Sequence, residues 1–182
     1  MLLPLQAIIT ISSEYKKTKL FKQLSITPLT KTEWLASKSL CYIFLNAISF
    51  LPMVAVGVFV FGANISLSFW LIPFLILGPI LFAALGMLAG TLTKDPEAAN
   101  TLLYLIVIPM MLLSGVFYPL TSLPIYLQYV AHILPLTYVN EGLSAVMIYG
   151  NYVQATVDIA VLIIITVILF VAATKLYNWR ED

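Results

Sequence analysis

Three long stretches of the chain carry no charged side chain or histidine. They lie between Lys38 and Lys94, between Glu97 and His132, and between Asp158 and Lys175. A helix needs about 20 mostly apolar residues to cross about 30 Å of hydrocarbon. The first stretch is long enough for two crossings joined by a turn at the polar residues 62–66. The pattern therefore predicts four full transmembrane helices, at residues 36–61, 68–92, 98–117 and 156–176.

Two further apolar stretches do not fit a full crossing. Residues 1–12 would cover only about 18 Å as a helix, so we expect a half-span that forms the inner end of a longer helix. Residues 118–155, termed the re-entrant segment, contain prolines too often for one straight span. We expect short helices there that enter the outer half of the membrane and return, with their irregular backbone buried in protein.

Positive charge and helical periodicity coincide in residues 13–34, termed the basic segment. Its apolar and basic positions recur at helical spacing at Lys17, Leu20, Phe21 and Leu24. Pro28 ends this predicted amphipathic helix. Two interpretations are open at this point: a helix that rests on anionic lipid, and a docking element for a cytoplasmic protein.

A second helix start follows directly after this proline. Thr30 and Glu33 have the spacing of a capping box, and Leu29 and Trp34 have that of a hydrophobic staple. The sequence thus predicts a sharp turn into the first span.

The nine basic residues all fall on one side of the membrane if these four spans are correct. Lys94 lies between the second and third spans, Lys175 and Arg180 follow the last, and the other six precede or open the first. Loops rich in Lys and Arg stay in the cytoplasm. We therefore expect a multi-pass protein of the cell membrane with its C-terminus in the cytoplasm.

Composition narrows the class of protein further. The chain of 182 residues is 62% hydrophobic and 9% charged, which excludes an ordinary soluble domain. A net charge of +1 excludes a nucleic-acid binder that works by counterion release. The single cysteine, Cys41, excludes an internal disulfide and a multi-cysteine metal site. The prediction is an all-α membrane protein formed by one transmembrane domain over residues 1–182.

Few polar groups in the apolar stretches suggest chemistry. Glu141 either touches a conduction path or has a hydrogen-bonded structural role. Asp158 is expected to open the last span, where a carboxylate complements the helix dipole. Gly86 and Gly90 form a Gly-x-x-x-Gly face that permits close helix packing, more often within a chain than between chains. No phosphate-binding loop is present, and neither a catalytic nor a metal site is predicted.

Two stretches resemble a known family. Residues 20–30, Leu-Phe-Lys-Gln-Leu-Ser-Ile-Thr-Pro-Leu-Thr, followed by 33–35 and Lys38, resemble the coupling-helix segment of ABC transporter permeases of the type-2 (ABC-2 type) export family. Residues 114–119, 122–124, 127–128 and 135–138 resemble the outer signature of the same family. Lys19 stands where family members often carry a glycine.

This resemblance implies a permease half that pairs with a second copy or a homologue. It implies a separate cytoplasmic ABC ATPase subunit that uses the ATP, with no cofactor bound by this chain. The residues implied to couple to the ATPase are Lys17, Leu20, Phe21, Gln23, Leu24, Thr27 and Pro28. Those implied to form the outer gate are Gly115, Pro119, Pro124, Pro135, Tyr138 and Glu141.

The resemblance also implies that the family's first helix and most of its second do not occur in this sequence. This motivates an alternative from another class, a membrane partner or assembly module that does not itself transport. A secondary transporter is disfavoured because the predicted spans contain no charged ion-coupling residue.

Overall fold

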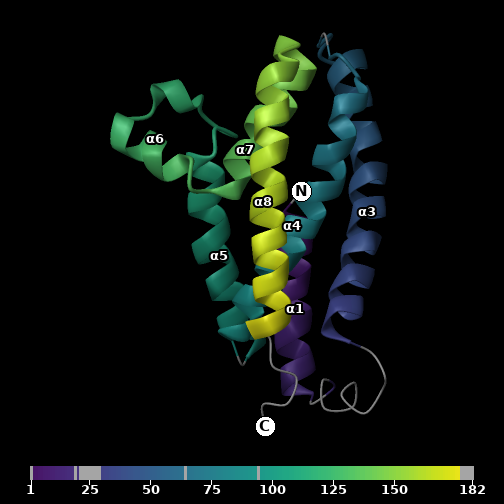
Figure 1. Cartoon of the computed structure of the whole chain (residues 1–182), viewed down its shortest axis with the longest axis vertical. Helices are drawn as coiled ribbons and strands as arrows, with labels where there is room; N and C mark the ends of the chain where they lie inside the picture. Colours follow the sequence, from purple (N-terminus) through teal and green to yellow (C-terminus); the bar gives the residue numbers. More distant parts are fainter. Residues whose placement is uncertain (1, 19, 21–29, 64, 94, 177–182) are drawn as a thin grey trace. The chain divides into compact units, whose positions relative to one another are not determined.

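Helices make up all the regular structure in the residues that the computed structural model describes, which are 2–18, 20, 30–63, 65–93 and 95–176. Figure 1 shows these helices with the labels used below. The α-helices are α1 Leu3–Lys17, α3 Lys31–Phe59, α4 Ile72–Thr91, α5 Pro96–Leu113, α6 Ile125–Ala131, α7 Pro135–Ser144 and α8 Tyr152–Leu176. Two single 3₁₀ turns, η1 Phe69–Leu71 and η2 Leu120–Ser122, and one π turn, η3 Ala145–Tyr149, complete the order.

Four helices are long and apolar enough to cross a membrane. They are Lys31–Phe59, Phe69–Thr91, Pro96–Leu113 and Tyr152–Leu176. The shortest has 18 residues, which corresponds to about 27 Å of helix, close to the thickness of the hydrocarbon layer. The prediction of an all-α membrane protein with four full spans is confirmed.

Local caps decide where these helices begin and end, and they shift the predicted boundaries. The first span begins at Lys31 rather than 36 because the predicted capping box forms: Thr30 N donates to Glu33 Oε2 at 2.8 Å, and Glu33 N donates to Thr30 Oγ1 at 3.3 Å. The third span ends at Leu113 rather than 117 because Gly115 adopts a left-handed φ of +79° that a helix cannot contain. Leu29 of the predicted staple lies outside the described residues.

Internal contacts divide the chain into two units. Unit 1 comprises residues 1–42, 79–107 and 166–182, and unit 2 comprises residues 43–78 and 108–165.

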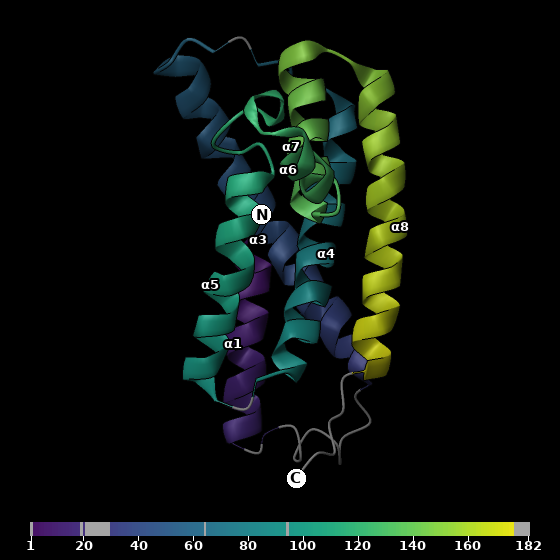
Figure 2. The same ribbon diagram turned by 90° about the vertical axis from the view of Figure 1, so that its left-hand side faces the viewer.

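The core of unit 1 forms where α1 packs against small residues of α4. A Cβ added at Gly86 would lie 2.8 Å from the backbone oxygen of Leu5, and one added at Gly90 would lie 2.8 Å from Ser12 Cβ. Figure 2 shows α1 running beside the C-terminal half of α4, as these contacts require. Around them lies a buried cluster of Ile8, Trp34, Leu35, Ala83, Ala84, Met87 and Ala173.

The half-span is therefore longer than predicted. Helix α1 continues to Lys17, and Ser12 and Ser13 are fully buried. Residues 13–17 of the basic segment thus belong to this packed helix.

Unit 2 packs its helices around another glycine. A Cβ at Gly142 on α7 would meet the ring of Phe74, which is fully buried, and would lie 3.3 Å from Asp158 Cβ. The loop before η1 is held to η3, because Ser66 Oγ donates to Val146 O at 2.9 Å and Ser66 N donates to Met147 O at 3.1 Å. Helix α7 and the π turn are thereby fixed in place within this unit.

Candidate functional site

The basic segment is described only at its two ends. Lys17 is the last residue of α1 and is exposed, and Leu20 is 37% exposed. The other residues implied to couple to an ATPase, Phe21, Gln23, Leu24, Thr27 and Pro28, lie outside the described residues.

Lys16 ties the start of the basic segment to the end of α4. Its Nζ donates to three backbone oxygens, those of Gly90 at 2.8 Å, Thr91 at 3.1 Å and Thr93 at 3.1 Å. These carbonyls belong to the last turn of α4 and the residues after it, where helix carbonyls lack intrahelical donors and the helix dipole favours a cation. In the sequence, Lys16 counts only as one of the six basic residues that precede or open the first span, and this role was not predicted. No local signal identifies a partner 74 residues away.

The re-entrant segment begins at a turn that needs glycine. The φ of Gly115 is +79°, and a Cβ there would lie 3.2 Å from Leu120 Cγ and 3.3 Å from Asn140 Nδ2. The same amide donates to the backbone oxygen of Ser114 at 3.3 Å. The end of α5 is thus fastened to α7.

Prolines stand at the starts of the short helices. Pro119 precedes η2, Pro124 occupies the N-cap of α6, and Pro135 is the first residue of α7. Proline suits these positions because it lacks the N–H that a helix start leaves unpaired. Short helices thus replace one straight span, and the prediction for residues 118–155 is confirmed in this respect.

Polar side chains satisfy the irregular backbone between these helices. Thr137 Oγ1 donates to Ala131 O at 2.6 Å, and Tyr138 Oη donates to His132 O at 2.7 Å. Partial burial raises the pKa of the Tyr138 phenol above its usual value, which keeps the group protonated as a donor. Backbone groups in an apolar medium require such partners.

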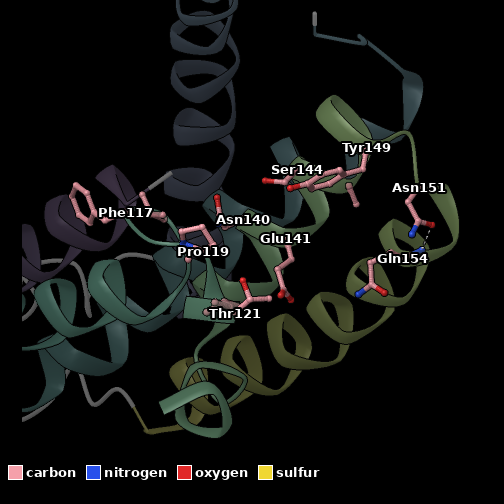
Figure 3. A pocket seen from close by; sticks show the side chains of 13 residues that line it. Phe117, Pro119, Thr121, Asn140, Glu141, Ser144, Tyr149, Asn151 and Gln154 are labelled. Atoms are coloured by element: carbon pink, nitrogen blue, oxygen red, sulfur yellow. Dashed lines mark hydrogen bonds between the residues drawn. The ribbon is translucent and has the colours of Figure 1, made fainter. Parts of the chain in front are cut away.

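A cavity of about 540 Å³ opens between the turn after α5, η2, α7, η3 and the start of α8 (Figure 3). Three of the six predicted gate residues, Gly115, Pro119 and Glu141, line it. Pro124, Pro135 and Tyr138 are not among the lining residues and instead shape α6 and α7. The rest of the lining consists of Val116, Phe117, Leu120, Thr121, Asn140, Ser144, Ala145, Tyr149, Asn151 and Gln154.

The π turn widens the backbone on one side of this cavity. It ends at Gly150, whose φ is +63°, and Asn151 N donates to Ala145 O at 2.8 Å across it. Single π turns often occur at functional sites because they displace side chains from the regular helical face. Here the turn contributes Ala145 and Tyr149 to the lining.

Asp158 lies inside the last span and not at its opening. Helix α8 begins at Tyr152, because the side chain of Asn151 accepts a hydrogen bond from Gln154 N at 3.2 Å. The interpretation of Asp158 as a partner of the helix dipole is therefore wrong, and the last span carries an acidic side chain in its interior.

The Asp158 side chain is only 1% exposed. Its Oδ1 accepts from Gln154 Nε2 at 3.2 Å, and its Oδ2 has no hydrogen-bond partner within the described part of the chain. Gln154 itself lines the cavity, so a second acidic group lies directly behind that side chain.

A sequence model of the family described as "ABC-2 family transporter protein" matches residues 1–175. The chain belongs to the ABC-2 family. The resemblance inferred from residues 20–38 and 114–138 is thereby confirmed at the level of the family.

Several curated relatives of this ABC-2 family member are transport permeases by name. The probable multidrug ABC transporter permease YbhS of Escherichia coli K12 is 29% identical over 176 residues, which are 95% of this chain and 46% of the relative. The inner membrane transport permease YadH of the same organism is 28% identical over 137 residues, 69% of this chain and 52% of the relative. Nodulation protein J of Rhizobium leguminosarum bv. viciae is 26% identical over 133 residues, 70% of this chain and 51% of the relative.

The chain spans about half the length of the curated relatives it matches. No solved structure matches it significantly. The ABC-2 assignment therefore rests on sequence, and the geometry of the two sites above rests on this structure.

Proposed function

We propose that this chain is a membrane-spanning permease subunit of an ATP-driven ABC exporter. The observation that carries the proposal is the ABC-2 family match over residues 1–175. The four long apolar helices support it, because they supply the spans that a translocation path needs. The names of YbhS and YadH, both called permeases, also support it.

In this proposal, ATP is hydrolysed on a separate cytoplasmic ATPase subunit that docks on the basic segment. The charge pattern supports this orientation, because the nine basic residues fall on one side of the four spans and residues 118–155 on the other. The C-terminus is then cytoplasmic, and the cavity of the re-entrant segment opens on the outer side. A second permease copy or a homologue completes the path.

Co-purification tests the docking step. The chain, tagged and co-expressed with a candidate ABC ATPase subunit from the same genome, is expected to retain that subunit through purification. Leu24→Asp is expected to reduce the recovered ATPase about tenfold or more, because it puts a charge into an apolar contact. Leu67→Asp is the matched control, because Leu67 lies in the loop after α3, on the opposite side of that span.

Equal recovery of the ATPase with both variants would contradict docking on the basic segment. A stable complex that hydrolyses ATP but moves no cargo in vesicles would instead favour the assembly-module alternative.

A further inference from the structure

The cavity of the re-entrant segment has the size and lining of a ligand site. Its volume of about 540 Å³ falls in the range of small-molecule pockets, roughly 300 to 1,000 Å³. The whole cavity belongs to unit 2.

The charge in this lining is negative. Glu141 is the one charged side chain among the 13 lining residues, and Figure 3 shows it projecting from α7. In the described part of the chain, no lysine, arginine or histidine lines the cavity, and no side chain donates a hydrogen bond to the Glu141 carboxylate. The carboxylate is thus free to pair with a charge that comes from outside the chain.

A second acidic group lies behind this lining. Asp158 is buried behind Gln154 and bonded to its amide at 3.2 Å, and its other oxygen has no partner among the described residues. An anion in the cavity would meet the Glu141 carboxylate directly, with no basic lining residue to offset it. The site therefore disfavours anions by charge.

The lining also contains apolar and aromatic side chains. Val116 and Leu120 contribute aliphatic surface, and the rings of Phe117 and Tyr149 are 59% and 76% exposed. Aromatic faces attract cations, most strongly where water is scarce. An apolar molecule that carries a positive charge would pair with Glu141 and also contact these apolar side chains.

A metal ion fits this lining less well than an organic cation. Hard cations such as Ca²⁺ take 6 to 8 oxygen ligands, several of them carboxylates. Within the described residues no group of three or more His, Cys, Asp or Glu side chains is placed to hold a metal ion.

We propose that this cavity binds a lipophilic organic cation, with Glu141 as its counter-charge and Phe117 and Tyr149 against its apolar body. The proposal deepens the proposed function, because it names a substrate class for the same permease. Binding to the cavity does not itself require the ATPase.

An isosteric ion pair tests the proposal on the full 182-residue chain in nanodiscs of phosphatidylcholine. Tetraphenylphosphonium and tetraphenylborate have nearly the same shape and opposite charge. Equilibrium dialysis against empty nanodiscs separates protein binding from partition into lipid. We expect saturable binding of tetraphenylphosphonium, and for tetraphenylborate only the partition seen with empty discs.

Glu141→Gln is expected to weaken tetraphenylphosphonium binding about tenfold, because it removes a poorly solvated charge while keeping the side-chain shape. Glu97→Gln is the matched control, since Glu97 is an exposed carboxylate in the first turn of α5 and does not line the cavity. Its affinity is expected to remain unchanged. Thr121→Trp, at an exposed position of the lining, is expected to block binding sterically without altering charge.

Equal binding of the two ions would overturn the proposal, as would an unchanged affinity of a folded Glu141→Gln variant. A similar loss of tetraphenylphosphonium affinity in Glu97→Gln would also overturn it, because the effect would then come from the net charge of the protein and not from the cavity. The nanodiscs contain no ATPase. The binding result therefore does not depend on whether the co-purification experiment detects ATPase docking. A chain that recruits the ATPase but does not distinguish the two ions would overturn the cation site alone.

Discussion

The two glycine contacts of unit 1 and the glycine turn of unit 2 serve opposite purposes. On α4, Gly86 and Gly90 let α1 approach until no space for a methyl group remains, and Lys16 satisfies the carbonyls at the end of that contact. In unit 2, Gly115 turns the chain away from α5, and a cavity of about 540 Å³ opens beyond it. One region is closely packed with its charge satisfied, and the other keeps space and a Glu141 carboxylate that accepts no side-chain hydrogen bond from the described residues.

Unit 1 is packed as a rigid contact between helices, whereas the cavity of unit 2 leaves room for a ligand. Close packing with paired polar groups resists deformation, whereas a polar cavity with an unpaired charge is suited to a ligand. Three predictions test this contrast.

Gly86→Ala is expected to lower the free energy of unfolding by up to about 3 kcal/mol. The added Cβ would lie 2.8 Å from the backbone oxygen of Leu5, which cannot move aside as a side chain can. Unfolding by added SDS in mixed micelles measures the change.

Gly57→Ala on α3 is the control for this prediction, because its Cβ would meet only the end of the flexible Ile65 side chain at 3.1 Å. Its stability is expected to be unchanged, or higher by up to about 1 kcal/mol. Equal losses in both variants would show that α4 is not specially packed.

Lys16→Met is expected to cost about 2 kcal/mol, because three backbone oxygens would lose a charged donor. Methionine keeps most of the apolar stem of the lysine side chain, so the loss of stability reports the contribution of the ammonium group. Lys17→Met is the neighbouring control at an exposed position, with an expected change of less than about 0.5 kcal/mol. The same unfolding titration compares them, and equal effects would refute a role specific to Lys16.

Thr137→Val is expected to cost about 1 kcal/mol, since the buried Ala131 oxygen would lose the hydroxyl that donates to it at 2.6 Å. Thr156→Val is the control, because the Thr156 side chain is exposed and its hydroxyl donates to the backbone oxygen of Tyr152 within the same helix. Thermal unfolding in detergent distinguishes them, and a larger loss in the control would argue against backbone support of the re-entrant segment by Thr137.

The four spans were predictable because the hydrocarbon layer strongly excludes charged side chains. Long stretches of sequence without charged residues are therefore enough to locate them. Their ends were less predictable. Asn151 caps α8 well before the apolar run becomes obvious, and this cap moved Asp158 from a helix opening to the interior of a span. The Gly-x-x-x-Gly face indicated a close approach but not that α1 makes it.

The cavity and the Lys16 contacts could not be read from the sequence. Each depends on residues far apart in the chain that meet only after the helices have packed. Lys16 and its acceptors are separated by 74 to 77 residues, and the cavity draws on residues from Gly115 to Gln154. Residue type alone did mark Glu141 as noteworthy, because carboxylates in apolar segments are rare.

The Lys16 contacts add a polar link to a junction that packing already makes. Ser12 of α1 lies against Gly90 in the last turn of α4, with no room for a methyl group between them. Beside this contact, the Lys16 ammonium group donates to the backbone oxygens of Gly90, Thr91 and Thr93 over distances of 2.8 to 3.1 Å. The start of the basic segment therefore cannot separate from the end of α4 without breaking both the packing and these hydrogen bonds.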